Sequence, residues 1–369
     1  MKTYKIALLA GDGIGPEIMK EAVKILELVE TRNDVKFDLK PALFGAAAYF
    51  AVGNAFPDET KAICDDADAI LKGTIGLSHE ESKKIPVDDQ PERGALLPMR
   101  RRYNTYANFR PVNLPKKLAY FSPLKPEVIG EGIDIMIIRE LVGGLYFGNK
   151  ELGVNAEGKR YVKETLEYDE DQIRQILIVG FETAMKRKKV LHNIHKSNVL
   201  KSSVLWNEIL DEVKVDFPEV EVKHILVDAA ATYLCLDPTQ FDTMVMENMF
   251  GDILSDQGGG ILGSLGLMPS ACMGPEKSYY EPSHGSAPDI AGKNVANPYS
   301  MIGSVAMMLE MSFGMEKEAA NLWDAMQKVF ADGYTTPDLA KFDPDAKQIA
   351  TDAFGDRVAT ALAAMPKPA

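Results

Sequence analysis

Residues 241–285 read FDTMVMENMFGDILSDQGGGILGSLGLMPSACMGPEKSYYEPSHG and hold the most informative pattern of the chain. The pattern predicts a short apolar strand at 244–246, followed by a helix that places Asp252 and Asp256 four residues apart on one face. Like charges at this spacing repel each other, so we expect a cation beside them. A third carboxylate, Asp228, follows an apolar stretch upstream. Three converging carboxylates without a Cys or His cluster favour a hard divalent cation, Mg²⁺ or Mn²⁺.

Outward from this segment, predicted strands alternate with predicted helices, which indicates an α/β fold. We expect strands at 4–10, 35–39, 69–72, 106–112, 133–139, 190–195 and 222–227, and helices at 16–30, 169–188, 199–213, 298–313, 317–331 and 346–364. Residues 143–168 mix charged residues, glycines and β-formers, which predicts a β-hairpin arm for pairing subunits. A chain of 369 residues is too long for one compact core, so we expect two lobes.

The composition excludes several classes of protein. The formal net charge of −13 argues against nucleic acid as a partner, because phosphate binding needs a basic surface. The three cysteines, Cys64, Cys235 and Cys272, lack zinc spacing, and their odd number is no disulfide framework, so we expect a reducing cytoplasm. No apolar run reaches the ~18 residues of a membrane span, so no membrane partner is expected. The N-terminus also lacks the pattern of a signal peptide.

The glycine-rich turn GDGIGPE at 11–17 invites a dinucleotide-binding interpretation. The G-x-G-x-x-G fingerprint needs a third glycine so that helix and strand can pack closely. Pro16 occupies that position. We therefore favour a tight structural turn over a pyrophosphate site.

Seven segments that span nearly the whole chain carry a family resemblance. They are GDGIGPE (11–17), LLPMRRRYNTYANFRP (96–111), IRELVGGLYFG (138–148), HKSNVL (195–200), VDAAA (227–231), ENMFGDILSD (247–256) and EPSHGSAPDIAGKNVANP (281–298). In this order they resemble the β-decarboxylating dehydrogenases, which act on 3-isopropylmalate, isocitrate, homoisocitrate, tartrate or D-malate. The resemblance implies a two-lobed fold that is not a Rossmann fold. Residues 1–106 and 262–369 would form the first, cofactor-binding lobe, and 107–261 the second, with the dimerisation, metal and substrate residues.

The resemblance is strongest to the branch that acts on 3-isopropylmalate in leucine biosynthesis, and it implies the chemistry. A 2-hydroxy diacid gives a hydride to NAD⁺, loses CO₂ and leaves an enolate that must be reprotonated, which yields 4-methyl-2-oxopentanoate. By resemblance Lys196 is the general base and Tyr146 the acid. Asp228, Asp252 and Asp256 would be the metal ligands, and Asp228 would also bind substrate. In this family Asp228 and Lys196 reach the site from the other subunit, so a homodimer with shared active sites is implied.

Substrate selection is predicted to lie on the helix around ALLPMR, residues 95–100. Leu96 and Leu97 precede Arg100 by four and three residues, so a carboxylate clamp and an apolar wall share one face. The resemblance adds Arg110 and Arg139 as further clamps, because arginine holds a carboxylate through two parallel hydrogen bonds. Val199 is expected to line the isopropyl pocket beside the leucines. The neighbours of Arg100, residues 101 and 102, are interpreted as plain surface charges.

By resemblance the cofactor contacts lie mainly in the 281–298 segment. The expected cofactor-binding residues are Glu92, His284, Gly285, Ser286, Ala287, Pro288, Asp289 and Asn297. NADP-dependent relatives carry Lys followed by Tyr where this chain has Asp289 and Ile290. A carboxylate there accepts hydrogen bonds from ribose hydroxyls and repels a 2′-phosphate, so NAD⁺ is expected.

One residue departs from the pattern of the closest branch. Those relatives usually carry Asp before the catalytic lysine, whereas this chain has His195, as isocitrate dehydrogenases do. The substitution removes a charge that favours protonated lysine. A sister enzyme acting on D-malate or tartrate stays open as an alternative, and so, independently of His195, does a relative without catalysis.

Overall fold

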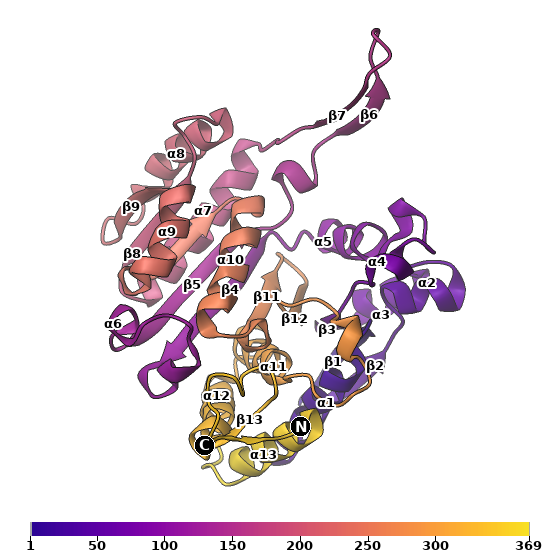
Figure 1. Ribbon diagram of the computed structural model, residues 1–369, viewed down its shortest axis with the longest axis vertical. Coiled ribbons are helices and arrows are strands. Elements are labelled where there is room, and N and C mark those ends of the chain that lie inside the picture. Colours follow the sequence, from indigo (N-terminus) through magenta and orange to yellow (C-terminus); the bar gives the residue numbers. More distant parts are fainter. Residues whose placement is uncertain (1, 369) are drawn as a thin grey trace.

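In the computed structural model, which describes residues 2–368, ten strands form one mixed sheet (Figure 1). Its order is β2-β1-β3-β12-β11-β4-β5-β10-β8-β9. The strands are β1 (Lys2–Gly11), β2 (Val35–Pro41), β3 (Ala69–Thr74), β4 (Ala107–Pro115), β5 (Gly132–Glu140), β8 (Val190–His195), β9 (Glu221–Leu226), β10 (Thr243–Met246), β11 (Pro269–Met273) and β12 (Ser278–Pro282). The chain therefore has an α/β fold, which is the class that the sequence predicts.

The sheet has two parallel halves joined by antiparallel strands. β2, β1, β3 and β12 pair in parallel on one side, and β5, β10, β8 and β9 on the other. The β11–β4 pairing, which sets Ala271 opposite Phe109, joins the halves. The chain thus returns to the first half through β11 and β12 after building the second. The predicted lobe boundaries stay a prediction, and their outermost residues, 1 and 369, lie outside the described range.

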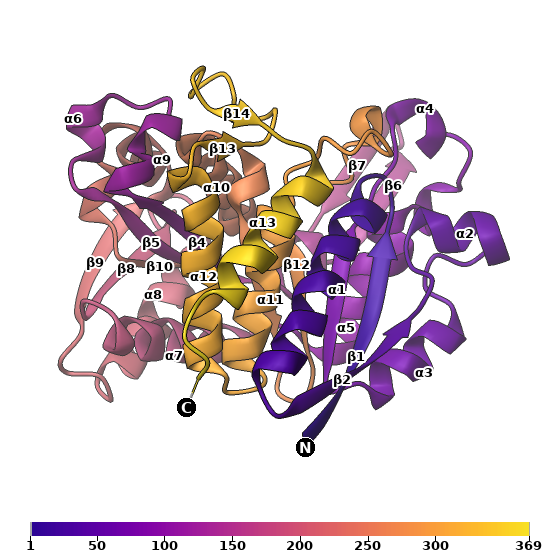
Figure 2. The ribbon, with the colours of Figure 1, turned by 90° about the horizontal axis from the view of Figure 1, so that it is seen from below.

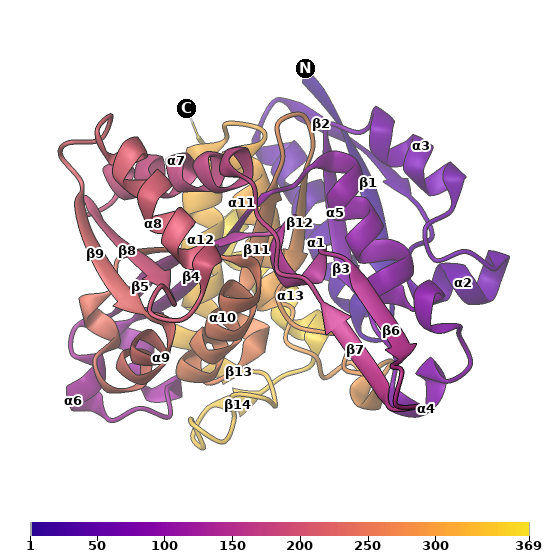
Figure 3. The same ribbon diagram turned by 90° about the horizontal axis from the view of Figure 1, so that it is seen from above.

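Helices cover both halves. In the first half α1 (Gly15–Arg32), α11 (Tyr299–Met311), α12 (Glu316–Ala331) and α13 (Thr351–Ala363) pack together in front of the sheet (Figure 2). In the second half α7 (Glu170–Lys186) and α8 (Lys201–Lys214) lie on one face, and α9 (Val227–Leu236) and α10 (Asn248–Leu262) on the other (Figure 3). Shorter elements are α2 (Ala46–Val52), α3 (Asp58–Asp66), α4 (His79–Ser82), α5 (Leu97–Tyr103), α6 (Pro126–Ile129), β13 (Tyr334–Thr335) and β14 (Lys347–Gln348). No helix within 2–368 is long and apolar enough to cross a membrane.

The predicted hairpin is present. β6 (Lys150–Val154) and β7 (Arg160–Glu164) pair antiparallel and project from the second half (Figure 1). Two facing apolar side chains on it, Leu152 and Val162, are 84% and 68% exposed. Its role in pairing subunits stays a prediction.

Some local expectations were wrong. The strand expected at 222–227 is β9, which stops at Leu226, and Asp228 lies in the first turn of α9, an unpredicted helix that the alanine-rich residues 229–231 favour. The last helix begins at Thr351 rather than 346, since residues 347–348 pair as β14 with β13. Strands β11 and β12 and helices α2 and α3 were not predicted.

The turn at 11–17 has the favoured structural role. The buried carboxylate of Asp12 accepts hydrogen bonds from the backbone N–H groups of Ala46, Ala47 and Gly76 at 2.8–3.0 Å. The backbone N–H of Ile14 donates to the carbonyl of Ser286 at 2.9 Å. The turn therefore holds three loops of the first half together.

Candidate active site

A cavity of about 350 Å³ lies where α5, the loop after β12, strands β4 and β5, and helix α10 meet. Ten predicted site residues line it: Glu92, Leu96, Leu97, Arg100, Arg110, Arg139, Tyr146, Asp252, His284 and Gly285. These residues come from distant parts of the sequence. The cavity therefore brings together predicted substrate, catalytic, metal and cofactor positions.

The three predicted carboxylate clamps are buried, and the Nε of each donates to a neutral side chain. The Nε of Arg100 donates to the Tyr279 hydroxyl at 2.9 Å. The Nε of Arg110 donates to Oδ1 of Asn108 at 2.8 Å. Arg139 is only 1% exposed, and burial together with the nearby Arg110 lowers its pKa to about 10. Such burial excludes a simple surface role and concentrates positive charge at the cavity.

The two carboxylates of α10 are paired with these arginines. Oδ1 of Asp252 lies 2.5 Å from Nη1 of Arg139, and Oδ1 of Asp256 lies 3.3 Å from Nη1 of Arg110. Burial opposes ionisation of Asp252, yet Arg139 and Arg110 hold its pKa below the ordinary value. Burial raises the pKa of Asp256. Within one chain, the cations that offset the like charges of Asp252 and Asp256 are therefore Arg139 and Arg110.

Tyr146 lies on the loop after β5, opposite α5. Its hydroxyl donates to Oδ2 of Asp252 at 2.8 Å. Burial and the Asp252 carboxylate raise its pKa to about 12. The phenol is therefore protonated at neutral pH and oriented by a cavity carboxylate.

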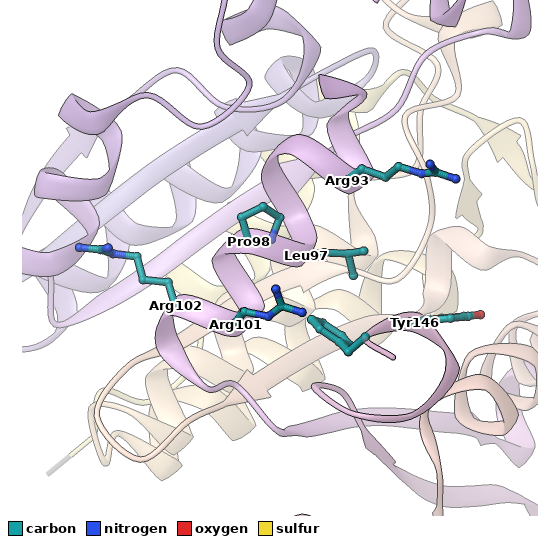
Figure 4. A pocket seen from close by; sticks show the side chains of 7 residues that line it. Arg93, Leu97, Pro98, Arg101, Arg102 and Tyr146 are labelled. Atoms are coloured by element: carbon teal, nitrogen blue, oxygen red, sulfur yellow. The ribbon is translucent and has the colours of Figure 1, made fainter. Parts of the chain in front are cut away.

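A second pocket of about 570 Å³ adjoins the cavity and shares Leu97 and Tyr146 with it (Figure 4). Its other lining residues are Arg93, Pro98, Arg101, Arg102 and Phe147. Arg102 forms an exposed ion pair with Asp65, as a surface charge does. The guanidinium of Arg101 instead lies over the Phe147 ring, 5.4 Å from its centroid, and so connects the two halves.

Nine of the predicted site residues do not line the cavity, among them Lys196, Val199 and Asp228. Nζ of Lys196 is 2.7 Å from Oδ1 of Asp228, and this hydrogen bond lowers the Asp228 pKa. Val199 is 70% exposed and does not lie in the cavity with Leu96 and Leu97, contrary to expectation for a single chain. Within 2–368 no three His, Cys, Asp or Glu side chains form a metal-binding group. The predicted convergence of three carboxylates therefore does not occur within one chain, because Asp228 lies on α9, where it pairs with Lys196.

Of the eight predicted cofactor residues, Glu92, His284 and Gly285 line the cavity and the other five do not. A Cβ on Gly76 would lie 3.2 Å from Glu92 and 3.4 Å from the Ser286 hydroxyl, so both side chains border the same glycine. Ala287 has a left-handed backbone (φ 41°), which is rare for a residue with a side chain.

The predicted cofactor residues of the 284–297 segment are either held by hydrogen bonds or exposed. Asn297 is buried, and its Oδ1 accepts from the backbone N–H of Tyr299 at 3.0 Å. Nε2 of His284 lies 2.8 Å from the Ser300 hydroxyl, and burial lowers the His284 pKa. Pro288 and Asp289 are exposed, so the Asp289 carboxylate is available to a ligand.

Sequence reasoning missed a buried ion pair beneath Arg100. Nζ of Lys72 lies 2.5 Å from Oε2 of Glu281, and Nη2 of Arg100 lies 3.7 Å from Oε1 of the same carboxylate. Although burial opposes ionisation, Lys72 and Arg100 hold the Glu281 pKa low. Both Lys72 and Glu281 line the cavity. A lysine inside the apolar strand AILK (69–72) was the available signal.

Comparisons with known proteins agree on one family. The family model "Isocitrate/isopropylmalate dehydrogenase" matches residues 5–358. The chain is 47% identical over 358 residues to a 3-isopropylmalate dehydrogenase of Desulfitobacterium hafniense, covering 97% of this chain and 99% of that protein. It is 45% identical to one of Thermotoga maritima, covering 97% and 99%. The crystal structure of isocitrate dehydrogenase from Methylococcus capsulatus matches with a TM-score of 0.84 at 31% identity, over 97% of this chain and 99% of that one.

Proposed function

The chain belongs to the isocitrate/isopropylmalate dehydrogenase family, and on this premise we propose that it oxidises and decarboxylates 3-isopropylmalate to 4-methyl-2-oxopentanoate with NAD⁺, in leucine biosynthesis. The observation that carries the substrate is the cavity wall, where Leu96 and Leu97 line the same space as Arg100. Burying an isopropyl group there contributes roughly 2 kcal/mol, at ~0.8 kcal/mol per buried carbon. The third carboxylate of isocitrate would meet two leucines and stay unpaired, which is costly.

The arginines are suited to orient the substrate before reaction. Arg100, Arg110 and Arg139 project into one cavity, and each is braced by a hydrogen bond to a buried neighbour. A braced guanidinium fixes the plane of a bound carboxylate through two parallel hydrogen bonds. Orientation of this kind lowers the barrier by removing rotational freedom in advance.

We assign Lys196 as general base for the substrate hydroxyl and Tyr146 as the acid that reprotonates the enolate. When bound, the divalent cation polarises the C2 oxygen and NAD⁺ accepts the hydride. Tyr146 is suited to its role because its raised pKa keeps the proton on the phenol until a carbanion-like acceptor forms. Its hydrogen bond to Asp252 sets the direction of that phenol.

The α10 carboxylates fit a hard cation. Asp252 and Asp256 offer only oxygen ligands, their side chains are 38% and 54% exposed, and Asp252 lines the cavity. They would hold Mg²⁺ or Mn²⁺ together with Asp228 of a second copy of the chain. Lys196, Val199 and Asp228 lie outside the cavity of their own chain, and a site shared across a homodimer would supply them from the second copy.

The dimer proposal is supported by exposed apolar side chains on α9 and α10, two helices that contact each other. Ile253 of α10 is 59% exposed and Leu236 of α9 is 65% exposed. Exposed apolar side chains on neighbouring helices, together with those on the hairpin, suit burial against a second copy.

The cysteines are free thiols, which supports a reducing, cytoplasmic location.

We propose NAD⁺ rather than NADP⁺ as the cofactor because the side chain of Asp289 is exposed and negatively charged. A carboxylate at this point can accept hydrogen bonds from both ribose hydroxyls, and its charge repels a 2′-phosphate. Glu92 and Ser286, which border Gly76, would contact the cofactor on the cavity side.

The test is reduction of NAD⁺ by the purified protein with Mg²⁺, comparing 3-isopropylmalate, D-malate and isocitrate. A kcat/KM for isopropylmalate far above the other two supports the leucine wall. Equal or better activity on D-malate would contradict the substrate assignment and make the leucines merely permissive. Absence of activity on all three would overturn the proposed function.

A further inference from the structure

The hydroxyl of Tyr168 lies at the centre of a polar cluster that the proposed reaction does not use directly. It donates to Oε2 of Glu140 at 2.9 Å and accepts from the backbone N–H of Asn248 at 3.0 Å. A second carboxylate, Oε2 of Glu247, lies 3.4 Å away. We call Glu140, Tyr168, Glu247 and Asn248 the Tyr168 cluster. Its members come from the end of β5, the residue before the capping Asp169 of α7, and the start of α10.

Asn248 connects the cluster to a substrate clamp. Its Oδ1 accepts from Nε and Nη2 of Arg139, at 3.1 and 2.8 Å. Its Nδ2 donates to the carbonyl of Gly143 at 3.0 Å. The side chain has no exposed surface, so water cannot replace these contacts. The Asn248 amide therefore sets the orientation of the Arg139 guanidinium.

Glu140 connects the cluster to the loop of the catalytic acid. Its carboxylate accepts from the backbone N–H groups of Val142 and Gly143, at 2.7 and 3.0 Å. A Cβ added to Gly143 or Gly144 would lie 2.4 or 2.5 Å from atoms of Tyr168, so the loop lies flat against the phenol. This loop continues directly to Tyr146.

Glu247 connects the cluster to the helix of the metal ligands. Its carboxylate accepts from the backbone N–H groups of Met249 and Phe250 and caps the N-terminus of α10. Two carboxylates thus approach one phenolic proton inside the protein, and burial raises the pKa of both Glu140 and Glu247. A hydroxyl that donates to a carboxylate and accepts from a backbone N–H joins these elements in one fixed geometry.

We propose that Tyr168 is a positioning residue of the active site: its hydroxyl holds the backbone N–H of Asn248, whose side-chain amide orients Arg139, and it holds the Tyr146 loop against α10. This proposal rests on the proposed function, in which Arg139 binds a substrate carboxylate and Tyr146 is the acid. Tyr168 itself touches no reacting atom. The effect of losing its hydroxyl is therefore expected on the hydroxy acid side of the reaction, and not on the cofactor loops of the first half of the sheet.

The test is the variant Tyr168→Phe, which keeps the ring against Gly143, Gly144 and Trp206 and removes only the hydroxyl. Tyr120→Phe is the matched control, since Tyr120 is 41% exposed and lies outside the cavity. Kinetics are measured with isopropylmalate and NAD⁺ varied separately, alongside the thermal midpoint. Crystal structures of wild type and variant provide a readout that does not depend on activity.

For Tyr168→Phe we expect kcat/KM for the hydroxy acid to fall about 10-fold or more, with the KM for NAD⁺ within twofold of wild type. The crystal structure should show the Arg139–Asn248 contacts lengthened or lost. Unchanged kinetics, or equal increases in both KM values, would overturn the positioning role. If wild-type protein turns over none of the hydroxy acids, the proposed function fails, and the crystal structure alone decides: intact Arg139–Asn248 contacts overturn the proposal and broken ones support it.

Discussion

Arg139 and Asp252 form a 2.5 Å ion pair in which a proposed substrate clamp contacts a proposed metal ligand. Oδ2 of Asp252 also accepts a hydrogen bond from the Tyr146 hydroxyl, so one carboxylate connects the proposed clamp, metal position and acid. A metal bound there must compete with Arg139 for this carboxylate. Substrate and metal binding are therefore expected to be coupled, because a substrate carboxylate can take over the partnership with Arg139.

Asp252→Asn should weaken Mn²⁺ binding about 10-fold or more, because a neutral amide is a poorer ligand for a hard cation. Electron paramagnetic resonance measures free Mn²⁺ without turnover. Asp65→Asn, which changes an exposed carboxylate paired with Arg102 outside the cavity, is the matched control. Equal Mn²⁺ affinity in wild type and Asp252→Asn would remove Asp252 from the ligand set.

Mixing two inactive variants tests whether active sites are shared. A heterodimer of Lys196→Ala and Tyr146→Phe would contain one site with both defects and one with neither. Random pairing should restore about a quarter of wild-type activity, since half the dimers are mixed and half their sites intact. Co-expressed chains with different affinity tags give the pure heterodimer. If each chain builds its own complete site, the heterodimer stays as inactive as its parents.

Leu96→Ser combined with Leu97→Asn should lower kcat/KM for isopropylmalate more than for D-malate. Losing the apolar wall removes roughly 2 kcal/mol of isopropyl burial, which corresponds to an about 30-fold lower kcat/KM. D-malate has no isopropyl group, so this loss does not apply to it. Side-by-side kinetics of both substrates decide the outcome. Parallel losses on the two substrates would show that the leucines only support the fold.

Asp289→Lys should reduce the preference for NAD⁺ over NADP⁺, expressed as the ratio of kcat/KM values, by about tenfold or more. The substitution removes an acceptor for the ribose hydroxyls and adds a cation that attracts a 2′-phosphate. The exposed position makes a folding defect unexpected. Lys293→Ala, four residues along the same loop, serves as control, and an unchanged ratio in Asp289→Lys would refute the assignment.

The stability of the protein should depend on the protonation of Glu140. Burial raises the pKa of this carboxyl from 4.5 to about 7, so between these pH values the folded protein binds its proton more tightly than the unfolded chain. The contribution of Glu140 to the free energy of unfolding therefore falls as pH rises through this window. Tyr168, Glu247 and Arg139 are the titratable groups around it.

Glu140→Gln removes this titration. The difference in unfolding free energy, wild type minus variant, should drop by up to roughly 3 kcal/mol between pH 4.5 and 7. Urea unfolding at several pH values between 4.5 and 8 measures it. Parallel curves for the two proteins would mean that Glu140 keeps an ordinary pKa.

The sequence alone determined the family, the α/β class and most helices and strands, because local periodicity and ordered motifs are written along the chain. Helix spacing also placed Leu96, Leu97 and Arg100 on one face, and the family resemblance supplied the other seven predicted residues that line the cavity. Strands β11 and β12 escaped prediction because their pairing with β4 and β3 involves residues more than 150 positions away. The pairing of Asp252 with Arg139 was likewise invisible, as no local pattern links them.

Only the tertiary structure decided which charges meet. Lys72 and Glu281 form a buried pair beneath Arg100, and Tyr168 joins three elements through one hydroxyl. It also separated Asp228 and Lys196 from the cavity of their own chain, where the two side chains pair with each other. The physical reason is that electrostatic and hydrogen-bond partners are selected by distance in space, whereas sequence patterns record only which face of an element each residue occupies.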